Sequence, residues 1–184
     1  MKILITLFIL QFSLQAKSIW VYLDLGNTII DTRVKGDFKY FKKSQMFLND
    51  LVANGFSVGA ITNIPESFGD SHEAKLKTLK TYIQDNWKDG SFSWNSFKII
   101  FLPLHNGELK PSEVLYLRAL ENAKNCPSIY ISENLKEVEK AKSLGMAAYL
   151  FDFQEKQDYP EIDSLEDYIL SEYQREYSKE CLNN

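Results

Sequence analysis

The sequence predicts an α/β domain with three layers, α/β/α, built around a five-stranded and mainly parallel sheet. Short runs of β-branched, aromatic and aliphatic residues alternate with helical patterns between residues 19 and 153. These apolar runs carry almost no charge, as is usual for strands that helices cover on both faces. The 184 residues, 45% of them hydrophobic, are enough for one globular domain with a substantial core.

The first predicted strand, residues 19–23, ends in a group of polar residues. Asp24 follows it directly, Gly26 and Asn27 form a turn pair, and Thr28 comes next. An acid at the carboxyl end of a buried strand lies where open α/β sheets bind ligands. The same residues are equally compatible with an Asx turn that merely caps the strand.

The remaining elements follow in alternating order. Residues 38–54 have apolar side chains at helical spacing, and Asn54-Gly55 is a good helix stop. A helix that begins near Pro111 should place Val114, Leu117 and Leu120 on its buried face. In all, we expect strands at 56–61, 97–102, 128–132 and 146–153, and helices at 38–54, 73–87, 110–123, 134–144 and 164–181.

Polar residues recur where these strands end. Thr62 and Asn63 follow the second strand, and Glu133 follows the fourth, with Glu137 one helical turn later. Two carboxylates at one strand end repel each other unless a cation lies between them. Oxygen-only ligands favour Mg²⁺ over Zn²⁺. Alone, the two glutamates would favour a solvated, acidic helix start over a metal site.

Taken together and in this order, these residues resemble the four motifs of the haloacid dehalogenase (HAD) superfamily. Residues 24–28, Asp-Leu-Gly-Asn-Thr, resemble its Asp-x-Asp-x-Thr motif, with Gly26 in place of the second Asp. Thr62 resembles the second motif, and Lys110-Pro111 the third. The fourth, usually Gly-Asp-x-x-x-Asp, is similar to Ser-Glu-x-x-x-Glu at residues 132–137.

The resemblance implies a Rossmann-like HAD fold and a Mg²⁺-dependent phosphatase that forms an aspartyl-phosphate. Asp24 would be the nucleophile, and Lys110 would neutralise the charge of the reacting groups. Thr62, Asn63 and Lys110 would bind the substrate's phosphoryl group. The Mg²⁺ ligands would be Asp24, the backbone carbonyl of Gly26, Glu133 and Glu137. The substrate would be a phosphorylated small molecule or macromolecule.

Two other functions remain open. Gly26 cannot act as the general acid/base that the family's second Asp provides, so the protein could be an inactive binding or regulatory protein on the same fold. Dehalogenases also lack that second Asp, but they do not need the two metal-binding acids that Glu133 and Glu137 would supply.

The ends of the chain and its charge bear on location and partners. Met1-Lys2, an apolar stretch and Ala16 match a secretory signal peptide over residues 1–16, which would make the protein periplasmic or secreted; without cleavage it would be cytoplasmic. We then expect one domain over 17–184 without a sizeable cap and without a membrane span. A net charge of −4 gives no indication of nucleic-acid binding. Cys126 and Cys181 could pair in an oxidising compartment.

Overall fold

The computed structural model describes residues 18–88, 90–152, 158–178 and 181, so the predicted signal peptide lies outside the described residues. Its centre is a sheet of five strands in the order β5-β4-β1-β6-β7, and every pair is parallel. This confirms the predicted fold class. The strands are β1 (Trp20–Leu23), β4 (Ser57–Ile61), β5 (Ile99–Phe101), β6 (Ser128–Ser132) and β7 (Ala147–Leu150).

Strand β1 lies in the middle of the sheet and determines where a ligand site can form. Val21 is in register with Val58 of β4 on one side and with Ile129 of β6 on the other. The chain adds β4 and β5 on one side of β1, and later returns to add β6 and β7 on the other. The connections from these neighbouring strands therefore diverge, which leaves a crevice at the carboxyl end of β1.

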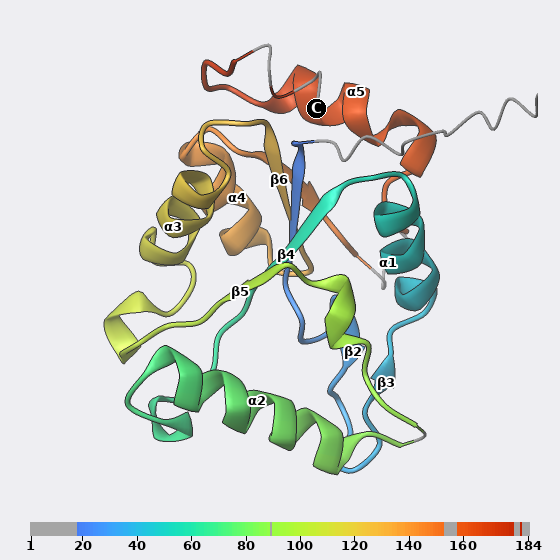
Figure 1. Cartoon of the computed structure of the whole chain (residues 1–184), viewed down its shortest axis with the longest axis vertical. Helices are drawn as coiled ribbons and strands as arrows, with labels where there is room; N and C mark the ends of the chain where they lie inside the picture. Colours follow the sequence, from blue (N-terminus) through green and yellow to red (C-terminus); the bar gives the residue numbers. More distant parts are fainter. Residues whose placement is uncertain (1–17, 89, 153–157, 179–180, 182–184) are drawn as a thin grey trace, which may run out of the picture.

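Helices cover both faces of the sheet (Figure 1). On one face α1 (Ser44–Ala53) packs with α5 (Ile162–Glu172), and on the other lie α3 (Val114–Asn122) and α4 (Leu135–Ser143). Alternate residues of β1 serve the two faces, as the period of a strand requires. Val21 and Leu23 belong to the first core, and Tyr22 packs into the second with Tyr116 and Tyr130.

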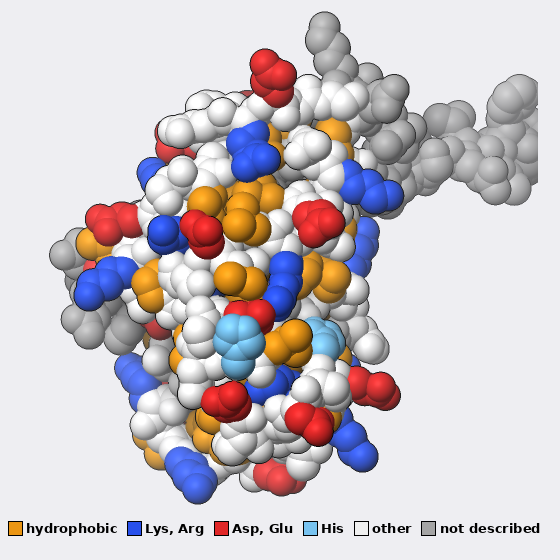
Figure 2. All heavy atoms as spheres, turned by 90° about the vertical axis from the view of Figure 1, so that its left-hand side faces the viewer, with side chains coloured by type: hydrophobic (Ala, Val, Ile, Leu, Met, Phe, Trp, Pro, Cys, Tyr) orange, Lys and Arg blue, Asp and Glu red, His pale blue; other side chains and the backbone are white. Residues whose placement is uncertain are grey.

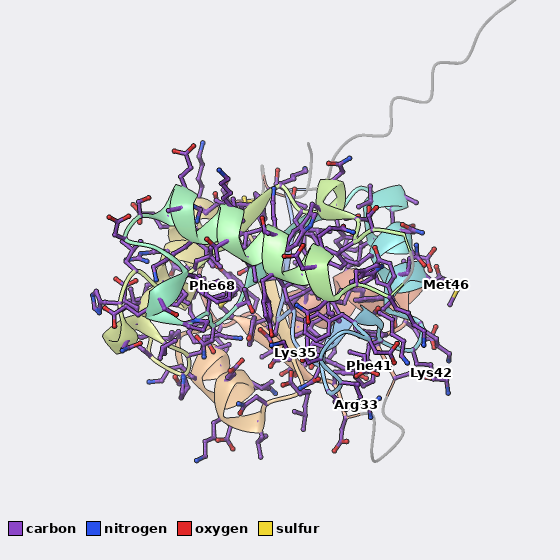
Figure 3. The ribbon with its side chains drawn as sticks, turned by 90° about the horizontal axis from the view of Figure 1, so that it is seen from below. Arg33, Lys35, Phe41, Lys42, Met46 and Phe68 are labelled. Carbon is purple, nitrogen blue, oxygen red and sulfur yellow. A yellow bond between two sulfur atoms is a disulfide. The ribbon has the colours of Figure 1, made fainter. Side chains whose placement is uncertain are left out.

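The remaining helix, α2 (His72–Asn86), lies across the carboxyl-terminal edge of the sheet (Figures 1 and 3). A small hairpin, β2 (Ile30–Asp31) with β3 (Lys39–Tyr40), lies at the same edge. Two backbone hydrogen bonds join the hairpin to the end of α2: Phe38 N donates to Asn86 O, and Lys88 N donates to Phe38 O. Residues between β4 and β5 thus contribute to the walls at this edge of the sheet.

Three predicted boundaries differ from the structure. Helix α1 begins at Ser44 because residues 39–40 pair with the preceding strand instead. Pro111 lies in a turn in which Ser112 N donates to Leu109 O, so α3 begins only at Val114 and Leu117 is 42% exposed. The last helix ends at Glu172, well before residue 181. Within the described part of the chain, no helix has the length and apolarity needed to cross a bilayer.

Strand β5 forms one side edge of the sheet, and a hollow of about 370 Å³ lies along it. Figure 2 shows a face of the molecule that carries the chain's two histidines. His72 contributes to the hollow and its Nε2 lies 2.9 Å from the Ile100 carbonyl oxygen. The His72 side chain therefore contacts the backbone of this edge strand.

Three 3₁₀ turns complete the described elements: η1 (Glu66–Phe68), η2 (Trp94–Ser96) and η3 (Asn106–Glu108).

A disulfide joins Cys126 to Cys181, with their Cα atoms 5.4 Å apart. Cys126 lies in the connection between α3 and β6, so the bond ties the end of the chain to the body of the domain. The sequence left this pairing open. A cross-link between residues 55 positions apart restricts the unfolded chain, and this generally stabilises the folded state.

Replacing Cys181 with serine should therefore lower the free energy of unfolding by about 2–4 kcal/mol. The measurement is urea unfolding at neutral pH without reductant, followed by circular dichroism. Reductant should lower the midpoint of the wild type and leave the Cys126→Ser/Cys181→Ser double variant unchanged. A wild type that contains two titratable thiols after purification under oxidising conditions would contradict the pairing.

Candidate active site

Asp24 is the first residue after β1 and lies in the crevice between β4 and β6. Its backbone N–H donates to Ile131 O at 3.0 Å, which continues the β1–β6 ladder by one residue and holds the side chain at the sheet edge. The residue is only 7% exposed. A carboxylate in such a position needs a cation or hydrogen-bond donors beside it, since removing it from water is costly.

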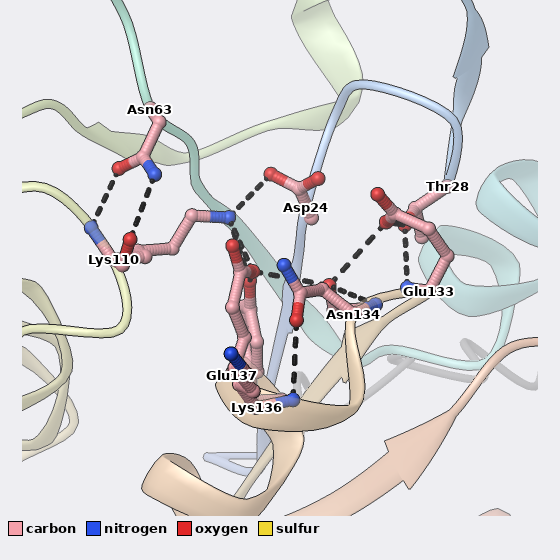
Figure 4. A network of polar contacts seen from close by, with 10 residues as sticks. Asp24, Thr28, Asn63, Lys110, Glu133, Asn134, Lys136 and Glu137 are labelled. Carbon is pink, nitrogen blue, oxygen red and sulfur yellow. Dashed lines mark hydrogen bonds and ion pairs between the residues drawn. The ribbon is translucent and has the colours of Figure 1, made fainter.

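Lys110 supplies that cation (Figure 4). Its Nζ lies 2.6 Å from Asp24 Oδ1 and 2.7 Å from Glu137 Oε2, and its side chain is 1% exposed. The third acceptor is the Tyr130 hydroxyl oxygen at 2.8 Å, and the same hydroxyl donates to Glu137 Oε2 at 2.6 Å. The ammonium therefore uses all three of its protons within the protein.

The pKa values of these groups reflect the competition between burial and charge. Burial raises the pKa of Asp24 to about 7; the positive charge of Lys110 opposes this, and the negative charges of Glu133 and Glu137 add to it. Burial alone would lower the pKa of Lys110, but the adjacent Asp24 and Glu137 carboxylates outweigh it and raise that pKa. Lys110 is therefore protonated at neutral pH, whereas Asp24 lies near its titration point.

The backbone of Lys110 is held from both sides by one side chain. Asn63, just beyond the end of β4, accepts from Lys110 N at 2.7 Å and donates to Lys110 O at 3.1 Å. The buried Glu108 carboxylate orders the loop before it, accepting from Leu104 N at 2.8 Å and from both Arg118 terminal nitrogens at 2.6 and 2.8 Å. These contacts bring the lysine of a surface loop into the crevice.

Glu133 and Glu137 lie at the same edge but have different partners. Glu137, in the first turn of α4, is 5% exposed and bonded to Lys110, whereas Glu133 Oε2 accepts from Thr28 Oγ1 at 2.6 Å. The Ser132 hydroxyl lies between them, 3.1 Å from Glu137 Oε2 and 3.4 Å from Glu133 Oε2. Asn134 caps α4, since its side chain accepts from Lys136 N.

The donor chemistry suits a hard cation, because all the candidate ligands are oxygen atoms. Three carboxylates face one ammonium at this edge, and the two glutamates raise the pKa of Asp24. As they stand, however, no three acidic, histidine or cysteine residues of the described chain are grouped closely enough to hold a metal ion. To hold such an ion, at least one carboxylate would have to give up a present hydrogen bond.

A pocket of about 290 Å³ adjoins Asp24 on the α2 side. Gly26 and the buried Thr62 belong to its lining, together with Asn63. A Cβ added to Gly26 would meet nothing closer than Thr32 Oγ1 at 3.7 Å, so a larger side chain has room there. Thr62 and Gly26 thus face open space beside the carboxylate rather than the Lys110 network.

The structure therefore brings together the predicted residues Asp24, Lys110 and Glu137, with Glu133 close by and Thr62 across the pocket. Asn63 differs, since its amide holds the Lys110 backbone. Sequence reasoning missed Tyr130 and Ser132, which both bond to Glu137. A signal was present: residues 130 and 132 of one strand point to the same face, two residues apart. The role of Glu108 had no sequence signal.

Comparison with known proteins supports the fold. No family model matches the sequence, and a search of curated proteins finds no match. Among solved structures, a HAD-superfamily hydrolase from Ehrlichia chaffeensis superposes with a TM-score of 0.55 at 13% identity, covering 85% of this chain and 98% of that one. The chain has a HAD-like fold.

Two further structures superpose comparably on this HAD-like chain. A haloacid dehalogenase-like hydrolase from Streptococcus pneumoniae has a TM-score of 0.52 at 12% identity and covers 82% of this chain and 91% of that one. A protein from Listeria monocytogenes serotype 4b has the same score and identity, with coverages of 83% and 97%. At this identity the likeness concerns the fold, and the chemistry must be argued from the residues themselves.

The loop that carries Lys110 yields a prediction about pH. Hydrogen bonds from Arg118 hold the pKa of Glu108 below its usual value, so this group stabilises the fold above its unfolded pKa of about 4.3 and loses the effect as the pH falls through the lower folded value. Glu108→Gln should cost about 1–2 kcal/mol at pH 7, because Arg118 is partly exposed, and much less at pH 3.

Urea unfolding of the wild type and the variant at both pH values measures this difference. Glu121→Gln, at an exposed position of α3, is the matched control and should change stability little. A stability loss from Glu108→Gln that is equal at pH 7 and pH 3 would show that the ionised carboxylate is not what orders the loop.

Proposed function

We propose that this protein is a Mg²⁺-dependent phosphatase that hydrolyses phosphoric monoesters through an aspartyl-phosphate on Asp24. The observation that carries the proposal is the buried contact of Asp24 with Lys110 and, through it, with Glu137 at the switch point of the sheet. An aspartate held against a fixed ammonium, directly before two residues that line a pocket, is placed to attack a phosphorus atom. The likeness of fold to HAD hydrolases agrees with this chemistry.

The proposed reaction has two displacements at phosphorus. A carboxylate oxygen of Asp24 forms a bond to phosphorus while the bond to the substrate's alcohol oxygen breaks. Water then attacks the aspartyl-phosphate, which releases inorganic phosphate and restores the carboxylate. Lys110 and the Thr62 hydroxyl offset charge on the phosphoryl oxygens. Fixed donors of this kind stabilise the charge of the transition state, which accounts for much of the catalysis of phosphoryl transfer. Asn63 contributes by holding Lys110 in position.

Mg²⁺ would be held by Asp24, the Gly26 backbone carbonyl, Glu133 and Glu137. When bound, it would offset the negative charge that the carboxylates and the phosphoryl group bring to one place. The charge imbalance among the described residues supports this assignment, since the buried Asp24 and Glu137 share the Lys110 ammonium and the half-buried Glu133 adds a further carboxylate. Glu137 would have to give up part of its bonding to Lys110, Tyr130 and Ser132.

Gly26 makes the proposed enzyme slow, since no acid stands where a leaving group would take its proton. A positioned acid or base commonly contributes on the order of 10²–10⁴-fold to rate. The departing alkoxide must then take its proton from water or from the substrate itself. The same feature supports the second candidate, an inactive binding or regulatory protein in which Lys110 neutralises the acids permanently.

We also propose an exported protein of one domain without a large cap. The signal-like segment at residues 1–16 supports export, and so does the disulfide, because such bonds persist in oxidising compartments. The substrate would be a phosphorylated small molecule or macromolecule, and the acidic net charge of −4 argues against nucleic acid.

The first test of this function is turnover of 4-nitrophenyl phosphate with and without Mg²⁺. The wild type should release phosphate only with Mg²⁺, and Asp24→Asn should lose at least about 10³-fold in kcat because the nucleophile is gone. Glu133→Gln and Glu137→Gln should weaken Mg²⁺ binding in calorimetry. No turnover at any Mg²⁺ concentration would contradict the phosphatase and favour the inactive binding protein. Release of halide from haloacids without metal would indicate a dehalogenase.

A second test concerns the missing acid. Gly26→Asp should raise kcat for an alkyl phosphate by roughly 10- to 100-fold, since an alkoxide needs a proton donor more than a nitrophenolate does. The side chain has room, as the open space beside Gly26 shows. Gly26→Asn has nearly the same volume without the acid and is the control. Equal rates for the Asp and Asn variants would mean that proton supply does not limit the reaction.

A further inference from the structure

The pocket beside Asp24 has an unusual lining for a site that would receive a charged ester. None of the residues that line it is acidic or basic. Most are aliphatic or aromatic, among them Leu25, Ile64, Leu79 and Ile83. Its volume of about 290 Å³ is at the lower end of the roughly 300–1,000 Å³ typical of small-molecule sites. It could enclose a compact group only.

Aromatic rings form one wall of this pocket. The Tyr82 ring makes edge contacts with Phe38 at 5.8 Å and with Phe68 at 5.6 Å between centroids. Phe38 is buried, whereas Tyr82 remains 39% exposed and Phe68 is half-buried. Figure 3 shows Phe68 beside α2. These rings offer apolar surface that a ligand could cover.

The few polar groups of the lining are largely engaged. Both ends of the Asn63 amide are bonded to the Lys110 backbone, and Thr32 Oγ1 donates to Asn27 Oδ1 at 3.1 Å. Thr62 faces the proposed phosphoryl position. A ligand rich in hydroxyl groups would therefore bury polar groups without partners, which disfavours its binding.

The place of the pocket connects it to the proposed chemistry. Leu25 and Gly26 directly follow Asp24, while Thr62 and Asn63 follow the adjacent strand. On the proposed function, the ester oxygen of a phosphoryl group bound at Asp24 would lie toward Leu25 and Gly26, which open to this space. The absence of a side chain at Gly26 keeps the entrance wide and uncharged.

We propose that this pocket binds the alcohol part of the substrate, and that this part is a compact apolar or aromatic group rather than a sugar, a polyol or a nucleotide. The inference rests on the proposed function, which places the phosphoryl group at Asp24. It assigns Phe68 and Tyr82 as specificity-determining residues. Binding of such a group buries apolar surface of both the ligand and the pocket, and this burial is the source of the preference for an apolar alcohol part.

The test compares 2-phenylethyl phosphate with glycerol 3-phosphate. Both are esters of primary alcohols, so the difference in intrinsic reactivity is small. We expect kcat/KM to favour the phenylethyl ester by about 10- to 100-fold. Phe68→Ser and Tyr82→Ser should each reduce this preference through KM, with kcat for the phenylethyl ester little changed. Thr81→Ala, at an exposed position next to Tyr82, is the control.

Equal or reversed preference in the wild type, or a preference unchanged in both variants, overturns the inference while leaving phosphatase activity in place. If neither ester is hydrolysed, binding of the matching phosphonates is measured by calorimetry with Mg²⁺ present. Preferential binding of the phenylethyl compound, lost in Tyr82→Ser, supports the pocket and rejects the proposed enzyme. Absence of binding, or equal binding of the two phosphonates, overturns the inference as well.

Discussion

The contact between the Lys110 ammonium and the Asp24 carboxylate is the interaction on which the site depends. Both groups are almost removed from water, and an isolated charge in either position would be strongly disfavoured. Glu137 and the Tyr130 hydroxyl complete the shell of the ammonium, so neither charge is left without partners. A buried group of this kind adds little net stability, but it fixes geometry, because removing any member leaves a charge uncompensated.

The rest of the fold can be understood as support for that contact. A parallel sheet with a switch point at β1 places the end of that strand between two others, so that Asp24, Thr62 and Glu133 approach one another from three strands. Lys110 comes from a loop, which needs more support than a strand end does. Asn63 and Glu108 provide it, one by bonding the lysine's backbone and the other by ordering the preceding residues.

The sheet and most of the site residues could be predicted from the order of apolar runs and polar residues along the sequence. Apolar runs that end in Asp24, Thr62 and Glu133 define both the sheet and the edge where their side chains meet, because strand pairing depends on local patterns. Contacts between distant residues were not predictable. Nothing local indicates that Arg118 orders Glu108. The predicted face of α3 was wrong at Leu117, because the helix buries the face of Leu115, Tyr116, Ala119 and Leu120.

The position of α2 was also beyond local patterns, and it changes what the site can bind. Its helical pattern was clear, but a helix of average apolarity can pack on a sheet face or across a sheet edge. Here its end is bonded to the hairpin after β1, and its buried residues Leu79 and Ile83 both join the main core and line the pocket. Three carboxylates with one ammonium make the inner end of the site negative, and a phosphate ester could enter only with a further cation beside Asp24. The outer end is uncharged. Under the proposed function, the two halves would select different parts of a ligand: charge balance would govern the phosphoryl end, and buried apolar area the other.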